Sequence, residues 1–447
     1  MNGEVTYDTR FCFYPFQVKA LAAGRYIAIS TQSANWIVVD NKQELQILKN
    51  LQSGSTVGEV VELLENEGDN SIESLQKILA KLAAREFAGV GHLPEVSRLE
   101  GFRMLNLYVT NACNLRCPHC FMNAGQAMKN ELSTIEIKNI LDDFKAEGGE
   151  CVTFTGGEPK MRPDFLEILQ HSKSIGLSNT VLSNGLLWSE DDIQNASPQI
   201  EEIQISIDGV DENTNSTIRG QDHFRKAVET AKAFSRYGTK VAIATTFAQE
   251  DLNVNLVPQY LSLKYEIESE SQNQVSFRFS KKILPGRGKT PTESQNHEYE
   301  RLIDQIEDAV KPNAKMENFM FGHEPNMVSR NCGIGGISIR SDGHVFLCNR
   351  VHEVDDYGHI SNQSMAEWLQ IAKDINDSTA VDNVEPCKTC FLKNICNGGC
   401  RIDDFNNKGQ TRNQVNQWVN TTCTEDRRGR LLDKMVKMFD LYYDFSQ

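Results

Sequence analysis

This sequence of 447 residues has no long apolar run, no basic surplus and no repeated or low-complexity segment. No apolar stretch approaches the ~18 residues that a membrane-spanning helix needs, so we expect no membrane partner. The segment from Met1 to Val5 lacks the basic and apolar regions of a signal peptide. We therefore expect a cytoplasmic protein.

The charge balance argues against another class of partner. The chain carries 46 Lys and Arg against 61 Asp and Glu, which gives a net charge of −15. Binding to bulk nucleic acid needs a basic face, so we expect no nucleic-acid partner. Hydrophobic residues at 39% and charged residues at 24% are ordinary for a globular protein, and the length suggests about three domains.

Cysteine is the residue in which this chain is rich. Ten of its twelve cysteines fall into two spacing patterns, and the first is Cys113-x3-Cys117-x2-Cys120. The second pattern contains Cys332, Cys348, Cys387, Cys390, Cys396, Cys400 and Cys423. Short fixed spacings bring several thiolates together, which predicts iron–sulfur clusters. A zinc site at the first pattern would need a fourth ligand such as His119, and disulfides would suit a small secreted domain better.

Residues 100–285 alternate between strand and helix patterns, which predicts a parallel α/β fold. A capping box, Ser133 with Glu136, opens the first helix. The expected strands are Arg103–Val109, Cys151–Thr155, Thr180–Ser183, Glu202–Ser206, Lys240–Phe247 and Val275–Ser280. Ligands in such folds bind at the carboxyl ends of the strands.

Polar and glycine residues follow several of these strands. The candidate binding residues at strand ends are Gly156, Gly157, Glu158, Ser183, Asn184, Ser206 and Asp208, with Arg219 in the next loop. Glycine lets a backbone approach a ligand closely, and the arginine fork is bidentate to a carboxylate. Taken singly, each could also be a turn or capping residue. The other two cysteines, Cys12 and Cys151, are expected to be structural.

The segment C-N-L-R-C-P-H-C, from Cys113 to Cys120, resembles the signature of radical S-adenosylmethionine (SAM) enzymes. The seven later cysteines resemble the SPASM extension of that family, and together the matches cover about residues 100 to 440. The resemblance implies a partial (β/α)6 radical SAM barrel and three [4Fe-4S] clusters. One cluster, on the first three cysteines, would bind SAM through an open iron.

The resemblance also implies roles for the other residues. Glu158 and the neighbouring backbone would hold the SAM amino group, while Ser206 and Arg219 would reach its carboxylate. The ribose contact would come from Ser183 and Asn184, the adenine contact from His119, and Asp208 is a further candidate. The outer auxiliary cluster would use Cys387, Cys390, Cys396 and Cys423. The inner one would use Cys332, Cys348 and Cys400, and since no eighth cysteine precedes Cys332, it would have an open iron or a non-cysteine ligand.

Residues 1–95 contain none of these cysteine spacings. The pattern predicts a strand over Phe11–Val18, a hairpin of Tyr26–Ile29 with Trp36–Val39, three helices, and a strand over Phe87–Val90. This winged-helix-like pattern resembles the RiPP recognition element, which binds the leader of a ribosomal precursor peptide as an added strand. A structural cap and a DNA-binding winged helix are the alternatives, although the third helix is only mildly basic.

The remaining chain is assigned by its composition and by the resemblance. Residues 320–447 would be the cysteine-rich SPASM domain, with 286–319 as a bridging helix or linker. We expect 251–274 and the Pro-Gly-Arg-Gly turn at 285–288 to be linkers or rims of the active site.

The combined expectation is a radical SAM oxidoreductase that crosslinks a ribosomal precursor peptide and takes electrons from a flavodoxin- or ferredoxin-type donor. A thioether is the first choice, as in sactipeptide and ranthipeptide maturases, and a carbon–carbon cyclophane is the runner-up. Sulfatase maturation is less favoured because Asn349, which cannot take a proton, follows Cys348. An iron–sulfur sensor that reads DNA is the remaining alternative. No general base is assigned.

Overall fold

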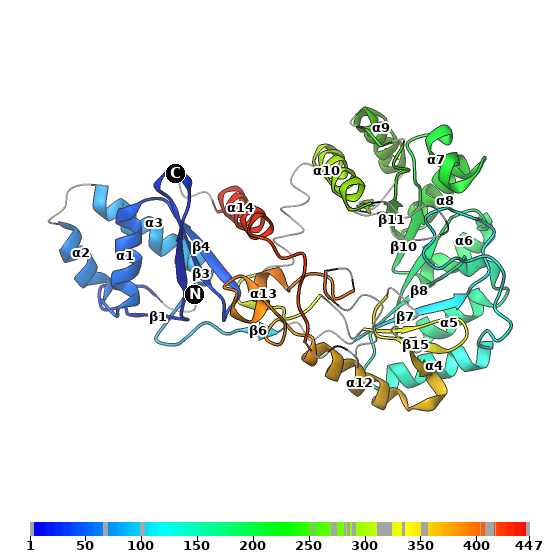
Figure 1. Ribbon diagram of the computed structural model, residues 1–447, viewed down its shortest axis with the longest axis horizontal. Helices are drawn as coiled ribbons and strands as arrows, with labels where there is room; N and C mark the ends of the chain where they lie inside the picture. The colour runs from blue at the N-terminus through cyan, green and yellow to red at the C-terminus, as the bar shows by residue number, and fades with distance from the viewer. Residues whose placement is uncertain are drawn as a thin grey trace. The chain divides into compact units, whose positions relative to one another are not determined.

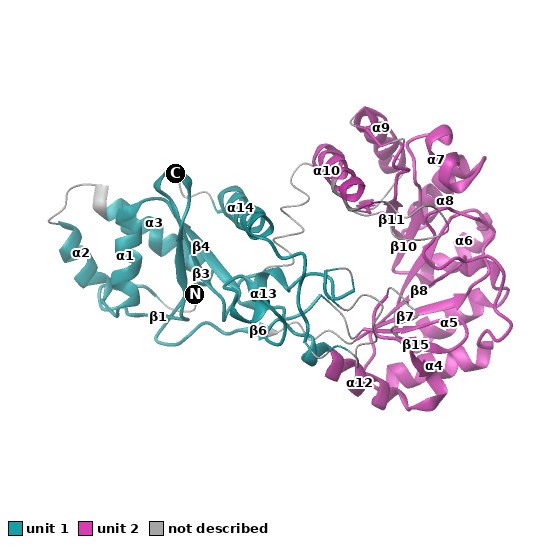
Figure 2. Cartoon of the chain, in the orientation of Figure 1, with its two compact units in different colours: residues 1–100, 315–332, 376–447 teal, residues 101–314, 333–375 magenta. Residues whose placement is uncertain are grey.

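The computed structural model forms two compact units, each assembled from separate parts of the chain (Figure 2). Unit 1 comprises residues 1–100, 315–332 and 376–447, and unit 2 comprises residues 101–314 and 333–375. The structure describes residues 4–65, 70–98, 103–250, 252–253, 255–269, 275–280, 283, 287, 292–310, 324–332, 336–349, 356–402, 404–406, 415 and 417–443. Residues 333–375 thus belong with the α/β segment, although they lie within the predicted cysteine-rich segment 320–447.

Unit 2 is built on a nine-stranded sheet in the order β12-β11-β10-β9-β8-β7-β14-β15-β16. Figure 1 labels its strands β7, β8, β10, β11 and β15. All neighbours from β12 to β14 run parallel, while β15 and β16 are antiparallel. The strands are β7 (Met104–Thr110), β8 (Cys151–Gly156), β9 (Ser178–Ser183), β10 (Glu202–Ser206), β11 (Lys240–Thr245), β12 (Ser276–Phe279), β14 (Ile337–Ile339), β15 (His344–Phe346) and β16 (Asp356–His359). The six predicted parallel strands are confirmed.

Helices connect the parallel strands of unit 2. They are α4 (Thr134–Ala146), α5 (Phe165–Ser174), α6 (Glu190–Ala196), α7 (Glu212–Arg219), α8 (His223–Arg236), α9 (Leu256–Ser269) and α10 (Glu293–Val310), and α12 (Met365–Ser378) lies across the boundary of the two ranges. The capping box of Ser133 and Glu136 is present at the start of α4. Residues 251–274 were expected to be a linker or a rim of the active site, and the linker was wrong, because α9 occupies most of the segment. Its Pro258 is tolerated since it lies in the first turn, where no backbone N–H is needed.

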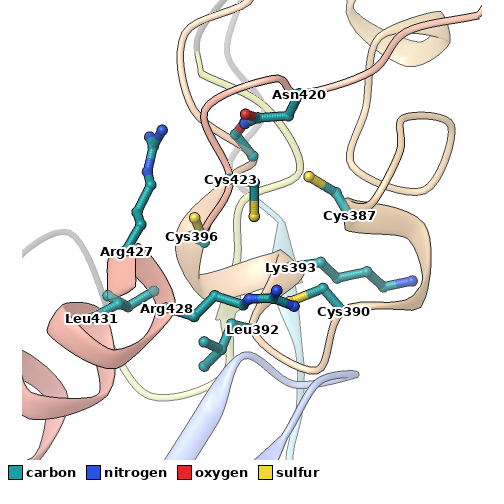
Figure 3. Close-up of a pocket in the computed structure, with 11 residues that line it drawn as sticks. Cys387, Cys390, Leu392, Lys393, Cys396, Asn420, Cys423, Arg427, Arg428 and Leu431 are labelled. Atoms are coloured by element: carbon teal, nitrogen blue, oxygen red, sulfur yellow. The ribbon is translucent and has the colours of Figure 1, made fainter. Parts of the chain in front are cut away.

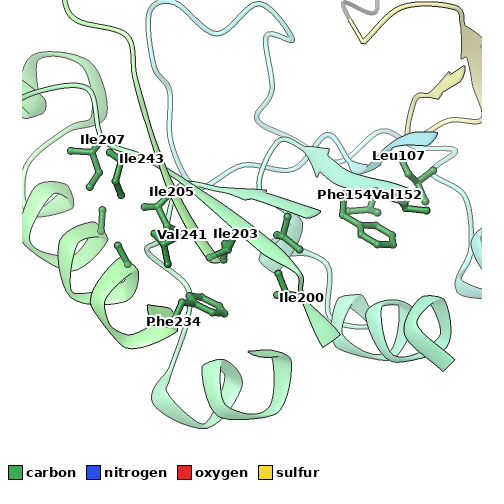
Figure 4. Packing of buried hydrophobic residues seen from close by; sticks show 14 of the residues in the cluster. Leu107, Val152, Phe154, Ile200, Ile203, Ile205, Ile207, Phe234, Val241 and Ile243 are labelled. Atoms are coloured by element: carbon green, nitrogen blue, oxygen red, sulfur yellow. The ribbon is translucent and has the colours of Figure 1, made fainter. Parts of the chain in front are cut away.

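The core of unit 2 lies between the sheet and its helices (Figure 4). Ile203 and Ile205 of β10 are fully buried, and the residues that alternate with them, Glu202, Gln204 and Ser206, are half-buried. Phe234 of α8 packs in the same cluster. One face of the sheet is therefore apolar and covered by helices, while its other face carries polar side chains toward the strand ends.

Unit 1 contains the three-stranded sheet β2-β3-β4 and two strand pairs, β1 with β5 and β6 with β13. Its elements are β1 (Phe11–Phe13), β2 (Gln17–Ala20), β3 (Tyr26–Ser30), β4 (Asn35–Val39), α1 (Lys42–Gln52), α2 (Val57–Glu65), α3 (Asn70–Ala84), β5 (Ala88–Val90), β6 (Ser97–Arg98), β13 (Met327–Val328), α13 (Lys393–Cys396) and α14 (Glu425–Tyr442). The predicted hairpin is confirmed as β3 and β4. The single predicted strand over Phe11–Val18 was wrong: it is split around Pro15, which lacks a backbone donor for a continuous ladder.

The core of unit 1 joins the beginning and the end of the chain. Trp36 is fully buried, and its Nε1 lies 3.3 Å from the carbonyl oxygen of Met435 in α14. Met438, Phe439 and Leu392 belong to the same apolar cluster as the residues of β3 and β4. The N-terminal elements are thus part of a core that the C-terminal segment completes.

Within the described ranges, none of the helices combines the length and the apolar composition that crossing a membrane requires.

Candidate active site and cysteine sites

The first three cysteines lie in the loop that follows β7. The backbone N–H of Cys113 donates to the carbonyl of Gly125 at 3.0 Å, and that of Cys120 donates to Cys117 at 3.2 Å, which folds the loop back on itself. Burial raises the pKa of the Cys113 thiol, and nearby Glu158, Cys117 and Cys120 add to this effect. The loop therefore gathers three thiols beside the end of β8.

Gly156 and Gly157 are required by the close approach of β8 to this loop. A Cβ on Gly156 would lie 2.2 Å from the carbonyl oxygen of Thr110, and one on Gly157 would lie 2.1 Å from that of Ala112. The backbone N–H of Gly157 donates to Thr110 and that of Glu158 donates to Ala112, both at 2.8 Å. The glycines thus allow the cysteine loop itself to pack against the strand end.

Glu158 is fully buried and links the ends of β8 and β9. Its carboxylate accepts hydrogen bonds from Ser183 Oγ at 2.8 Å, from the Asn184 N–H at 2.7 Å and from the Lys160 N–H at 3.3 Å. Burial raises the pKa of Glu158, and these hydrogen bonds oppose the shift. Asn184 Nδ2 also donates to Asn114 Oδ1 in the cysteine loop at 2.8 Å, so the network reaches the first pattern.

A second polar group lies at the end of β10. Asp208 is buried, and its Oδ2 lies 2.5 Å from Arg219 Nε and 3.5 Å from His119 Nε2. Its Oδ1 accepts the N–H of Thr246 at 2.7 Å, which ties the group to β11. Burial lowers the pKa of His119 below its ordinary value, although Asp208 opposes the shift. Arg219 also acts on Cys117, whose raised pKa it lowers in part.

Ser206 ends β10 one residue before Ile207 and pairs in register with Ala244 of β11. The structure thus places every candidate from the first pattern, the strand ends and the next loop at one edge of the unit 2 sheet.

Two residues that contact this site, His223 and Arg287, were not predicted from the sequence. His223 lies 2.9 Å from the Asn184 carbonyl oxygen, and Arg287 donates to Asn123 Oδ1 at 2.7 Å and to the Cys117 carbonyl at 3.2 Å.

Four cysteines of the second pattern line one pocket in unit 1 (Figure 3). The side chains of Cys387, Cys396 and Cys423 point into a common space, and Cys390 borders it. Burial raises the pKa of the Cys387 thiol to about 11, with Arg401 lowering it and the other three thiols raising it. Arg427 and Arg428 also line the pocket.

The other three cysteines of the pattern are divided between the units. Cys332 and Cys400 belong to unit 1 and Cys348 belongs to unit 2. In unit 2, the backbone carbonyl of Asn349 accepts a hydrogen bond from Tyr108 Oη, which places the residue after Cys348 beside β7. Over the described ranges, no three His, Cys, Asp or Glu side chains are arranged to hold a single metal ion.

Residues 107–251 match the family model described as the Radical SAM superfamily. The match begins within β7 and contains the cysteine loop, Glu158, Asp208 and Arg219. This chain carries a radical SAM domain. The resemblance drawn from Cys113 to Cys120 is thereby confirmed.

Several curated proteins are similar to more than half of the chain. The PqqA peptide cyclase of Bradyrhizobium diazoefficiens is 24% identical over 319 residues, which cover 69% of this chain and 83% of the cyclase. The sporulation killing factor maturation protein SkfB of Bacillus subtilis is 28% identical over 270 residues, 58% of this chain and 63% of SkfB. The mycofactocin maturase MftC of Mycolicibacterium smegmatis is 24% identical over 314 residues, which cover 66% of this chain and 77% of MftC.

Solved structures share the fold. Streptococcus suis SuiB bound to the precursor peptide SuiA has a TM-score of 0.51 and 17% identity, covering 89% of this chain and 95% of that one. Native anSMEcpe with bound AdoMet has a TM-score of 0.53 and 18% identity, covering 76% and 98%. At these identities the likeness extends to the fold alone.

The residues of the radical SAM domain fit the family's [4Fe-4S] cluster and SAM. Three thiols are gathered in one loop, with Cys117 buried and the others half-buried. Thiolate is the ligand that iron–sulfur clusters take from proteins, so Cys113, Cys117 and Cys120 would hold the cluster. Charges of both signs, on buried Glu158 and Asp208 and on the half-buried Arg219, lie at the strand ends around them, which suits a zwitterionic ligand.

The unit 1 pocket also fits a cluster. Four thiols line one space, and the other three each raise the pKa of Cys387. The arginines that line the pocket provide positive charge for an anionic cluster.

Proposed function

We propose that this chain is a radical SAM maturase that forms an intramolecular crosslink in a ribosomal precursor peptide. The observation that carries the proposal is the junction of the three-cysteine loop with buried Glu158 and the Asp208–Arg219 pair at one edge of the sheet. The relatives support the class of substrate, since they are named as a peptide cyclase and as maturation proteins.

Each binding residue has a role in holding SAM in this proposal. Glu158 would accept the SAM ammonium. A carboxylate has about four acceptor sites, and the chain occupies three of them with Lys160, Ser183 and Asn184. Arg219 and Ser206 would bind the SAM carboxylate, and Asp208 fixes the Arg219 side chain for that contact. The ribose would lie against Asn184 and the adenine against His119.

Bound together, the reduced cluster and SAM supply a 5′-deoxyadenosyl radical that removes a hydrogen atom from an unactivated carbon. The chain contributes position and exclusion of water. Cys117, Glu158 and Asp208 are buried, so the reacting groups are held in a low-dielectric edge of the sheet. The reductant in this proposal is a cytoplasmic flavodoxin- or ferredoxin-type protein.

The second cysteine pattern would hold two auxiliary [4Fe-4S] clusters. The pocket of Cys387, Cys390, Cys396 and Cys423 would hold the outer one. Cys332, Cys348 and Cys400 would hold the inner one, and three thiolates leave one iron open for a cysteine of the substrate. That opening favours a thioether product over a cyclophane. A crosslink formed after hydrogen abstraction also leaves one electron, which an auxiliary cluster can accept.

Residues 1–95 would bind the leader of the precursor as an added strand. β2 and β4 are the edge strands of the sheet in unit 1. All five residues of β4 are buried, and its Trp36 is hydrogen-bonded to α14, whereas Gln17 and Ala20 of β2 are exposed. The exposed strand β2 therefore offers the more accessible edge for main-chain pairing.

The proposal is tested by anaerobic co-expression with short open reading frames encoded next to this gene, followed by high-resolution mass spectrometry before and after thiol alkylation. The matched control is the same co-expression with Cys113, Cys117 and Cys120 replaced by alanine. We expect a peptide that has lost two hydrogens and one alkylatable thiol, only with the unaltered enzyme. The same mass loss with every thiol alkylatable would replace the thioether by the cyclophane. Unmodified peptides, despite SAM cleavage, would contradict crosslinking.

A further inference from the structure

A buried arginine in unit 1 lies beside cysteines of both auxiliary sets. Arg401 follows Cys400 directly, and its side chain has no exposed surface. Arginine stays protonated in proteins, so this position holds a permanent positive charge in the interior. Such a charge is costly unless an anion or a full set of hydrogen bonds compensates it.

The hydrogen bonds of Arg401 are incomplete. Its Nε donates to the Thr379 carbonyl at 2.8 Å, and Nη1 donates to the carbonyls of Asn397 at 3.0 Å and Gly399 at 2.6 Å. Nη2 is buried and has no hydrogen-bond partner in the described part of the chain. In those ranges Arg401 forms no ion pair with a carboxylate, Asp404 pairs with Arg427 at 3.2 Å, and the Arg401 guanidinium lies over the Phe405 ring, 4.8 Å from its centroid.

The guanidinium of Arg401 lies against Gly398, in the wall of the four-cysteine pocket. A Cβ on Gly398, a residue that lines the four-cysteine pocket, would lie 2.9 Å from Nη1 and 3.2 Å from Nη2 of Arg401. Burial lowers the pKa of Arg401, and the thiolates of Cys332, Cys387, Cys400 and Cys396 oppose this shift. Two of these four cysteines belong to the outer set and two to the inner set, and all four lie in unit 1.

We propose that Arg401 is the shared counter-charge of the two auxiliary cysteine sets and that its Nη2 donates an N–H···S hydrogen bond to a sulfur at the outer pocket. This inference rests on the auxiliary clusters of the proposed function. A ligated iron–sulfur cluster is anionic and gains further negative charge on reduction. A fixed positive charge and a hydrogen bond to sulfur therefore stabilise the reduced form and raise the reduction potential. Arg401 is thus a positioning and tuning residue for electron acceptance rather than a residue that touches the substrate.

The remaining arginines of the pocket supply a matched control. Arg428 lines the outer pocket and lowers the raised pKa of Cys423. It belongs to α14 and has Glu425 as an ion-pair partner at 2.7 Å. Its replacement should therefore affect the outer cluster alone, while replacement of Arg401 should affect both.

The test uses the full-length chain in which Cys113, Cys117 and Cys120 are alanine, reconstituted anaerobically, so that paramagnetic resonance reports only auxiliary clusters. In this parent, Arg401→Met should raise the oxidised-to-reduced ratio of both clusters at least tenfold at a fixed potential, equal to a shift of 59 mV for one electron. Arg428→Met should raise this ratio for one cluster only. Arg401→Lys keeps the positive charge, so the ratio should stay within threefold of the parent value for both clusters.

If Arg401→Met keeps its full iron content and the oxidised-to-reduced ratio of each cluster stays within threefold of the parent, the inference is overturned and the auxiliary clusters stand. A parent that binds no auxiliary iron would instead overturn the proposed clusters themselves. If Arg401→Met does not fold, a second experiment uses the parent with Arg427→Lys and Arg428→Lys, labelled with ¹⁵N-arginine. Electron–nuclear double resonance then measures the coupling of arginine ¹⁵N to each cluster. We expect ¹⁵N coupling to both clusters, and its absence would count against Arg401.

Discussion

The cysteine loop of unit 2 and the cysteine pocket of unit 1 collect the same donor atoms from differently organised stretches of chain. In unit 2, the loop follows one strand and meets residues that follow neighbouring parallel strands, such as Glu158 and Asp208. In unit 1, Cys423 precedes α14, and α14 packs on Trp36 from the other end of the chain. The first site depends mainly on the local order of strands, and the second depends on contacts between distant segments.

This difference predicts how each site responds to change. Substitutions at the strand ends of unit 2 should alter SAM chemistry with little effect on auxiliary iron. Substitutions in the core of unit 1 should reduce auxiliary iron with little effect on SAM chemistry. Deleting residues 1–95 is a poor test of leader binding for the same reason, because it would remove most of the apolar core that supports α14.

Removal of the first three cysteines should give the largest effect. Replacing Cys113, Cys117 and Cys120 by alanine should abolish SAM cleavage and remove about four iron atoms per chain, because three thiolates hold one cubane cluster. Iron content and 5′-deoxyadenosine formation measure the outcome. Auxiliary iron should be unchanged, and any surviving SAM cleavage would contradict the assignment of this loop.

Gly157→Ala should come next. Its Cβ would lie 2.1 Å from the Ala112 carbonyl oxygen, so the cysteine loop must move. We expect SAM cleavage to fall about 100-fold, since a displacement near 1 Å at a reacting centre costs that much. Gly148→Ala is the matched control, because that glycine has φ +86° but open space around it. It should lose about 1 kcal/mol of stability with normal SAM cleavage; equal activity losses in both variants would refute the steric argument.

Glu158→Gln should weaken SAM binding about 10- to 100-fold. The amide removes a charged acceptor from a buried position, and a hydrogen bond to a charged group contributes roughly 1.5–3 kcal/mol. Equilibrium dialysis of labelled SAM against the reconstituted protein measures the dissociation constant. Glu167→Gln, on the exposed side of α5, should bind SAM normally. Unchanged affinity in Glu158→Gln would remove this residue from the SAM site.

Substituting one fully buried tryptophan in each unit compares how the two units respond to a cavity in the core. Trp36→Ala in unit 1 and Trp188→Ala in unit 2 should each cost about 3–5 kcal/mol of unfolding free energy. Trp36→Ala should release auxiliary iron first on heating. Trp188→Ala should lose SAM cleavage first, because Trp188 Nε1 donates to Ser183 Oγ at 2.9 Å. Thermal unfolding followed by iron release and by activity measures both, and the same order of loss in the two variants would show that the units are not independent.

Gly429→Ala should give the smallest effect. This glycine lies inside α14, and a Cβ there would meet open space. Alanine should stabilise unit 1 by about 0.5–1 kcal/mol through its higher helix propensity. A rise in the melting temperature of auxiliary iron release, with unchanged SAM cleavage, is the expected result. A destabilised variant would mean that α14 needs the flexibility of this glycine.

Much of the fold could be predicted because unit 2 repeats a simple pattern. Apolar strands alternate with capped helices, and each motif follows a strand, so the strand-end position of Glu158 and Asp208 was evident before the structure. Two elements were not predicted. The helix α9 lies in a segment expected to be a linker or rim, and Pro15 divides what reads as one strand between two sheets.

The sequence by itself determined the chemistry: the cysteine spacings, the succession of six strands along the chain and the polar residues at the strand ends follow from local patterns of a few residues. Only the tertiary structure decided which distant groups meet. It placed α14 on Trp36, Arg287 on the cysteine loop, and Arg401 beside cysteines of two sets. The physical reason is the distance along the chain over which each kind of interaction acts. Periodicity and capping act between neighbours in the chain, whereas the burial of a side chain such as Arg401 depends on segments that no short pattern connects.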